Sequence, residues 1–218
     1  MKSEHAADAQ ARDARIRDAG EPSRTGARAS AARAACAGLA LCLATFSVAC
    51  ARDDWRDARR DSAGIAPLAA EHEEAVVQVY SAAVYGWRGM LADHSWIAVK
   101  AAGADTYRRY EVLGWRLRRG QPVVSARDGV PDHYWYGSEP KLHVDLRGAQ
   151  AEALIPRIDA ASACYPWADQ YRLWPGPNSN SYIQWIGLAV PELDLSLPWR
   201  ALGKNWMHDN FDARRLTC

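Results

Sequence analysis

The chain has 218 residues, with 27 basic and 26 acidic side chains and a formal net charge of +1. This balance gives no overall field that would attract nucleic acid or other strongly charged partners. A hydrophobic fraction of 49% is enough for one mid-sized folded domain with appended segments. Ten Trp and nine Tyr accompany only two Phe, which is typical either of an ordinary aromatic core or of an aromatic-rich cleft.

The N-terminal part is expected to lie outside the folded domain. Residues 1–33, rich in Ala, Arg and Asp, are expected to form a disordered leader. Residues 34–51 carry no charge and follow a basic stretch, which predicts a secretory signal or membrane anchor with the domain translocated out of the cytoplasm. Cys50 ends a Ser-Val-Ala-Cys run that loosely resembles a lipoprotein box, so it is a candidate for lipidation. The sequence leaves open whether this segment is cleaved, lipidated or retained.

Residues 52–74 read as a charged linker, 75–206 as one α+β domain and 207–218 as a tail. Strands are followed by helices, which favours a small antiparallel sheet packed with helices over an alternating βαβ fold. Cys164 and Cys218 are the two cysteines of the folded part, and the sequence leaves open whether they form a disulfide. The expected strands lie at 75–80, 94–100, 107–117, 121–125 and 142–146. The expected helices lie at 149–165 and 178–190, and Pro156 could kink the first of them.

Signatures of common cofactor and metal sites are absent from the sequence. It contains no phosphate-binding loop, no paired-glycine dinucleotide fingerprint, no HExxH and no Gly-x-Ser-x-Gly elbow. The spacing of His133 and His143 relative to Asp132 and Asp145 matches no metal motif. We therefore expect no cofactor and no metal.

The stretch Asn178-Ser179-Asn180-Ser181 has two interpretations. All four residues are good helix N-caps, because a short side-chain oxygen can accept from the free N–H groups of the first turn. The same position could instead present Ser179 as a nucleophile, with the helix N–H groups receiving an oxyanion. A serine nucleophile needs an adjacent base.

His94 is the candidate base, because it starts a predicted strand. Glu111, on the next strand, could orient its imidazole, as in other nucleophile–base arrangements. The alternatives are a structural histidine at position 94 and an ion pair of Glu111 with Arg108 or Arg109.

Several blocks resemble an uncharacterised bacterial family, the domain of unknown function 3750. They include HSWIAVK, YEVLGWRLRRG, PDHYWYGSEPKLHVDLRG, WPGPNSNSYI and GKNW, and the resemblance covers about residues 55–206. Family membership implies no known activity.

A more distant likeness is to circularly permuted papain-like proteins, such as NlpC-type peptidases and lecithin retinol acyltransferase. There a His begins an early strand, a polar residue on the next strand orients it, and a Cys begins a later helix. His94, Glu111 and Ser179 match those positions, which implies catalytic roles for them. Ser stands where the family has Cys, so the likeness implies either a serine variant or an inactive relative, because papain-like chemistry depends on a thiolate.

Two classes of function follow from these patterns. The first is a membrane-anchored protein of the bacterial cell envelope that hydrolyses amide or acyl bonds of a cell-wall or lipid substrate, or its inactive relative. The second is a noncatalytic module with an aromatic-rich cleft for a glycan, peptide or lipid. The expected partner is the membrane, through the N-terminal segment, and not nucleic acid. The candidate substrate-binding residues are Trp96, Trp174, Asn178 and Asn180.

Overall fold

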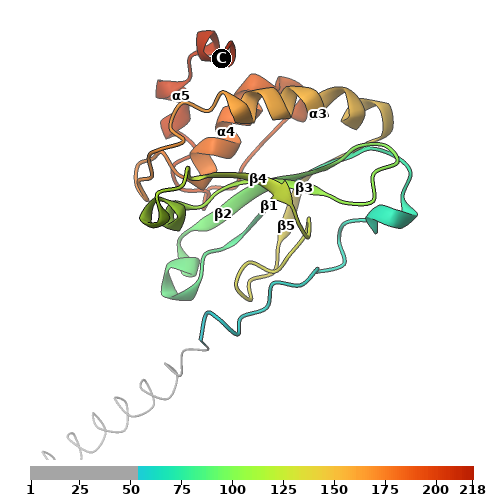
Figure 1. The fold of residues 1–218 in the computed structure, drawn as a ribbon. Coiled ribbons are helices and arrows are strands. Elements are labelled where there is room, and N and C mark those ends of the chain that lie inside the picture. The colour runs from blue at the N-terminus through green and yellow to red at the C-terminus, as the bar shows by residue number, and fades with distance from the viewer. Residues whose placement is uncertain (1–53) are drawn as a thin grey trace, which may run out of the picture. The chain divides into compact units, whose positions relative to one another are not determined.

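A computed structural model describes residues 54–218 of the chain, and these form one compact unit. Five strands make a single antiparallel sheet in the order β4-β3-β2-β1-β5 (Figure 1). The predicted α+β class with a small antiparallel sheet is confirmed. The strands are β1 (Val76–Ala83), β2 (Asp93–Lys100), β3 (Arg108–Val112), β4 (Val124–Asp128) and β5 (Lys141–Arg147).

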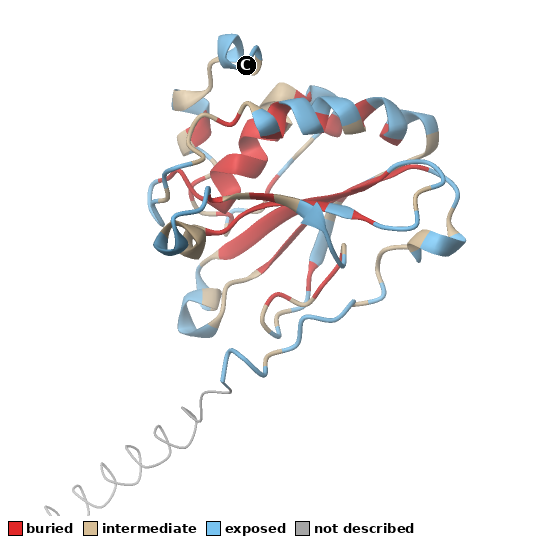
Figure 2. Cartoon of the chain, in the orientation of Figure 1, coloured by how far each residue is buried: buried red, intermediate tan, exposed pale blue. Residues whose placement is uncertain are grey.

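Helices cover one face of this sheet (Figure 1). The two long ones are α3 (Gly148–Ala163) and α4 (Ser179–Ala189), and the short α5 (Trp206–Asn210) follows near the C-terminus. Within α4 every residue from 179 to 186 is buried, whereas α3 buries only one side, as Figure 2 shows. The predicted helix continues through Pro156, which lies inside α3.

Strand alternation divides the core between the two faces of the sheet. Successive side chains of a strand point to opposite faces. On β2, Ile97 and Val99 belong to the cluster packed against α3 and α4, together with Tyr182, Ile183, Trp185 and Ile186. Trp96 and Ala98 belong to a second, smaller cluster on the other face, with Tyr80, Tyr107 and Trp135. We call this second face, which lies opposite α3 and α4, the open face.

The open face is partly covered by the segment expected to be a linker. Arg59, Asp61 and Ala63 exchange backbone hydrogen bonds with residues 132–137. The buried carboxylate of Asp132 accepts hydrogen bonds from the Ser62 hydroxyl and from the backbone N–H groups of residues 65 and 66. Residues 59–66 are therefore held against the domain rather than free of it.

Two segments differ from the sequence-based prediction. The strand expected to run to residue 117 ends at Val112 and continues as the 3-10 helix η3 (Gly114–Arg119). A side chain at Gly114 would lie 2.6 Å from the Tyr171 ring, so the backbone approaches that ring closely at this point. The C-terminal part, expected to be a tail, contains α5 and the 3-10 helix η5 (Ala213–Leu216). The remaining 3-10 helices are η1 (Ala69–Glu71), η2 (Gly86–Met90) and η4 (Pro191–Leu193).

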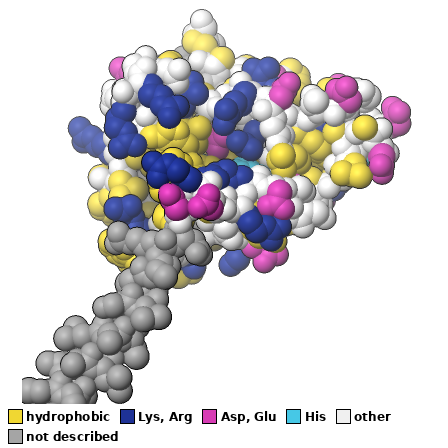
Figure 3. Space-filling view, turned by 60° about the horizontal axis from the view of Figure 1, so that its bottom comes forward, with side chains coloured by type: hydrophobic (Ala, Val, Ile, Leu, Met, Phe, Trp, Pro, Cys, Tyr) yellow, Lys and Arg dark blue, Asp and Glu magenta, His cyan; other side chains and the backbone are white. Residues whose placement is uncertain are grey.

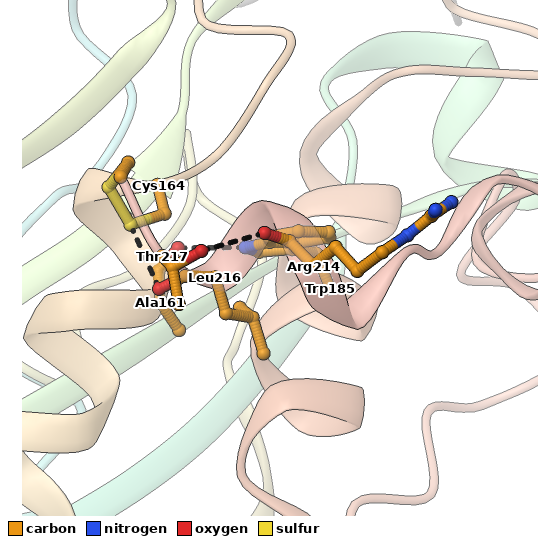
Figure 4. Close-up of a disulfide and its surroundings, with 7 residues drawn as sticks. Ala161, Cys164, Trp185, Arg214, Leu216 and Thr217 are labelled. Carbon is orange, nitrogen blue, oxygen red and sulfur yellow. Dashed lines mark hydrogen bonds between the residues drawn. A yellow bond between two sulfur atoms is a disulfide. The ribbon is translucent and has the colours of Figure 1, made fainter.

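A disulfide links Cys164, at the end of α3, to Cys218, with a Cα–Cα separation of 5.5 Å (Figure 4). Next to it, the Trp185 indole donates a hydrogen bond to the carbonyl of Ala161, and the Thr217 hydroxyl donates to the carbonyl of Arg214 (Figure 4). The bridge thus fastens the last residues of the chain to the helical layer.

The predicted leader, the apolar segment 34–51 and the candidate lipidation site Cys50 lie outside the described residues. Within residues 54–218 no helix combines the length and apolar character needed to span a bilayer.

Candidate functional site

The candidate site lies on the open face, where β2 and β3 bring two of the predicted residues together. His94 Nε2 lies 3.4 Å from Glu111 Oε2, and both side chains are almost fully buried. The two atoms face each other without the alignment of a hydrogen bond, and neither has another partner among residues 54–218. The expected proximity of His94 and Glu111 is therefore present.

Arg109 joins this pair from the same strand as Glu111. Its Nε and Nη2 atoms donate to Glu111 Oε1 at 3.0 and 2.8 Å. Its Nη1 atom donates to the carbonyl of Val130 and lies 3.3 Å from His133 Nδ1. The ion pair that the sequence offered as an alternative for Glu111 is thus formed, because residues 109 and 111 point to the same face of the strand.

The protonation states of this cluster follow from its burial and its charges. Burial alone would raise the pKa of Glu111, but contact with His94 and the charge of Arg109 outweigh it and bring that pKa to about 2. Burial lowers the pKa of His94, although Glu111 opposes the shift. Burial and the Arg109 charge lower the pKa of His133 to about 3. Near neutral pH the cluster therefore holds one carboxylate, one guanidinium and two neutral imidazoles.

A pocket of about 210 Å³ opens beside this cluster. Figure 3, which views the open face, shows hydrophobic and basic side chains, with some acidic ones beside them, around a hollow in this part of the surface. Aromatic rings from Trp115, Trp135, Tyr134 and Tyr136 form much of its wall. The other lining residues are Arg60, Arg109, Glu111, Leu113, Arg127, Val130 and His133.

Trp135 links the pocket wall to His94. Its ring stacks on the imidazole of His94, with 3.6 Å between the ring centroids. Trp96 lies behind this pair, fully buried, and its indole donates to the carbonyl of Pro131. Trp96, expected to contact a substrate, is therefore a core residue that supports the pocket.

The start of α4 is built as a helix cap. The Asn178 side chain accepts hydrogen bonds from the backbone N–H groups of Asn180 and Ser181, and the Ser181 hydroxyl accepts from the backbone N–H of Asn178. The Asn180 side chain accepts from the Ser95 hydroxyl and donates to the carbonyls of Asp93 and Leu202. Both asparagines, expected to bind substrate, thus tie α4 to neighbouring loops and to β2.

Ser179 and His94 are separated by the sheet. Ser95 points toward α4, as its contact with Asn180 shows, so its neighbour His94 points to the open face. Ser179 begins α4 on the other side, and its hydroxyl has no hydrogen-bond partner within residues 54–218. Trp174, the last predicted binding residue, is 68% exposed and does not line the pocket. In this arrangement His94 cannot take a proton from Ser179.

Several residues of the pocket were not singled out as a site from the sequence. The sequence marks His133 only as a possible metal ligand and Arg109 only as an ion-pair partner, and it indicates no role for Arg60, Arg127 or Trp135. The cluster PDHYWYG, which contains His133 and Trp135, was a usable signal because it combines titratable and aromatic residues in a short stretch. Among the residues that the structure describes, no group of three His, Cys, Asp or Glu side chains could hold a metal ion.

The fold and the pocket define an α+β domain with a buried ionic cluster under an aromatic pocket. Residues 74–206, more than half of the chain, match the family described as a protein of unknown function, DUF3750, and the chain belongs to this family. No curated protein matches the chain, and no solved structure matches it.

Proposed function

We propose that this protein is a noncatalytic binding module and that the pocket on the open face takes an acidic sugar unit. The observation that carries the proposal is the combination of aromatic walls with three arginines, Arg60, Arg109 and Arg127, and only one carboxylate, Glu111. Arg109 already pairs with Glu111, so the other two guanidinium groups give the pocket a net positive charge.

Arg127 is the residue best placed to contact an anionic group. It is exposed, and it makes no ion pair or hydrogen bond through its side chain within residues 54–218. Arg60, by contrast, stacks over Tyr136 at 4.4 Å and donates to the carbonyls of residues 56 and 58. A guanidinium group binds a carboxylate in a bidentate, planar geometry, so a free Arg127 favours a carboxylated ligand.

The size and walls of the pocket favour a sugar over a lipid or a long peptide. About 210 Å³ is below the roughly 300–1,000 Å³ of pockets that enclose drug-sized ligands, so it takes a single ring or an end group. Trp and Tyr rings present flat apolar faces with polar edges, which suits a ligand that has both apolar faces and hydroxyl groups. An acyl chain has no charged or polar group along its length with which the arginines could pair.

The ionic cluster supports binding rather than catalysis. The pKa of Glu111 is about 2 and that of His133 about 3, so neither group has a pKa matched to proton transfer near pH 7, and burial also lowers the pKa of His94. The described pocket is lined by no Ser, Thr, Cys or Lys that could act as a nucleophile. Hydrolysis by Ser179 has less support, because a base within hydrogen-bond reach is required and His94 lies across the sheet.

We place this binding in the bacterial envelope, on the outer side of the membrane that residues 34–51 are predicted to enter. Disulfides persist mainly in oxidising compartments, and the bridge between Cys164 and Cys218 agrees with such a location.

The test compares two ligands that differ mainly in charge, glucuronate and glucose. Saturation-transfer NMR on the full chain in detergent is expected to show glucuronate binding at least about tenfold more tightly, the worth of one charged hydrogen bond. Arg127→Gln should remove that preference. Arg157→Gln is the matched control, because Arg157 is an exposed arginine of α3 paired with Glu192. Equal binding of both sugars, or a preference that survives Arg127→Gln, would contradict the proposal.

A further inference from the structure

Three loops expose large apolar side chains at one end of the domain. They follow β1, precede α4 and follow η4, and we call the exposed side chains together the apolar end. Each of these side chains is at least 56% exposed, whereas large apolar side chains are mostly buried in folded proteins. The members are Trp87, Met90, Leu91, Leu173, Trp174 and Trp199.

Hydrogen bonds show that these loops lie side by side. The Arg200 side chain donates to the carbonyl of Gly89, and its own carbonyl accepts from the N–H of Asp93. The Asn178 side-chain amide donates to the carbonyls of both Leu173 and Leu202, at 3.0 Å each. The apolar end is therefore one surface rather than scattered residues, and contiguous exposed apolar surface of this kind marks an interaction site.

Basic side chains outnumber acidic ones around the apolar end, where Arg200 forms an ion pair with the buried Asp93. Residues 84–92, 171–175 and 198–204 contain four basic side chains and no acidic one. The basic residues are Arg88, Arg172, Arg200 and Lys204. Exposed Trp and Leu interleaved with Lys and Arg is the composition of surfaces that enter the headgroup region of anionic bilayers.

The chain enters the domain beside this surface. Trp55 contacts Tyr136, with ring centroids 6.2 Å apart, and Tyr136 contacts Tyr85 at 6.3 Å. Tyr85 directly precedes the loop that carries Trp87. Only residues 52 and 53 separate Asp54 from the apolar segment that ends at residue 51, and an extended chain spans about 3.5 Å per residue. If that segment enters a membrane as predicted, Asp54 is within about 10 Å of the bilayer surface.

We propose that the apolar end docks onto the surface of an anionic phospholipid bilayer, with Trp87 and Trp199 at headgroup depth. The bilayer is the favoured occupant because the basic loops match its charge and the short connection keeps the domain against it. This inference rests on the exposed side chains and charges of the apolar end and does not depend on the proposed sugar binding.

The experiment uses the full chain reconstituted into vesicles of phosphatidylcholine and phosphatidylglycerol that contain acyl chains brominated near the headgroup. Bromine quenches nearby indoles, so tryptophan fluorescence is expected to fall when the domain docks. The double variant Trp87→Phe/Trp199→Phe keeps an apolar surface but removes the two reporters, and it should lose most of the quenching. Trp115→Phe, which removes a pocket tryptophan, is the matched control and should keep it.

Three outcomes would overturn the inference. The first is equal quenching of the wild type and the double variant, and the second is unchanged quenching when phosphatidylglycerol is omitted. The third is crosslinking of two copies in vesicles that Trp87→Ser abolishes, because a second copy would then cover the apolar end. Loss of quenching together with intact glucuronate binding would separate membrane docking from the function of the pocket.

Discussion

The two faces of the sheet are buried by different means. On the helix-covered face, apolar side chains of β2 and β3 pack against the aromatic and aliphatic residues of α4. The polar groups there include the cap of that helix and the hydrogen-bonded hydroxyls of Ser162 and Tyr182. On the open face, the same strands bury Arg109, Glu111 and His94 under tryptophan rings and a short segment of loop. One sheet thus combines a packed core with an ionic cluster.

This difference shows where the fold is stabilised and where a ligand is bound. Burial of apolar surface contributes stability without directional requirements. A buried ion pair contributes little net stability, because removing charges from water offsets their attraction. The open face therefore contributes less stability through its smaller apolar cluster, and it holds charged groups next to an aromatic pocket.

The largest expected effect comes from truncating the core of the helix-covered face. Trp185 is fully buried, contacts the rings of Tyr165, Trp167 and Phe211, and donates a hydrogen bond to Ala161. Trp185→Ala is expected to reduce the free energy of unfolding by about 4 kcal/mol, the usual cost of removing a buried aromatic side chain.

The matched variant on the open face is Trp115→Ala. Trp115 is half-buried and lines the pocket, so we expect a loss of only about 1 kcal/mol together with loss of glucuronate binding. Urea unfolding followed by circular dichroism measures both variants. Equal losses of stability would contradict the division of roles between the two faces.

The second expected effect is a pH dependence that arises on the open face. The pKa of His133 is about 3 in the folded protein, well below its ordinary value of 6.5. As the pH falls from 7 to 5, the unfolded chain binds a proton at this residue that the folded chain does not. The free energy of unfolding should therefore fall by about 2 kcal/mol over this range. The lowered pKa of His94 acts in the same direction.

Urea unfolding at pH 7 and pH 5 tests this contribution. His133→Gln removes the titrating group but keeps an acceptor for Arg109, so its stability should fall by about 2 kcal/mol less than that of the wild type. The exposed His208 of α5 is distant in sequence from the cluster, and His208→Gln serves as the control. A wild type and a His133→Gln variant with the same pH dependence would show that His133 is protonated in the folded protein.

The sequence predicts the elements of the fold well because their signals are local. Turn residues and β-rich runs locate the five strands, and the Asn-Ser-Asn-Ser run locates the first turn of α4. The end of β3 at Val112 is not predicted, because the strand-like pattern of the sequence continues past that residue to Leu117. The disulfide joins residues 54 positions apart, and the sequence could only name its two cysteines.

The face to which His94 points was not predictable by hydrophobic pattern. All eight residues of β2 are buried, so apolar and polar residues do not alternate with the two faces as they do in a half-exposed strand. The pocket was not predictable either, because residues near positions 60, 110 and 135 come together only in the folded chain. Only the His94–Glu111 pair, on strands adjacent in the chain, could be expected from order alone.

The smallest expected changes in stability concern the start of α4, where they test whether the Asn-Ser-Asn-Ser run is a helix cap or presents a nucleophile. Asn178→Ala removes the acceptor for two backbone N–H groups and is expected to reduce the free energy of unfolding by about 1.5 kcal/mol. Ser179→Ala removes a hydroxyl that has no partner among residues 54–218, so we expect a change of less than about 0.5 kcal/mol. Labelling of the wild type, but not of Ser179→Ala, by a serine-directed fluorophosphonate would instead identify Ser179 as a nucleophile. Since His94 lies across the sheet, such labelling would also require a base other than His94.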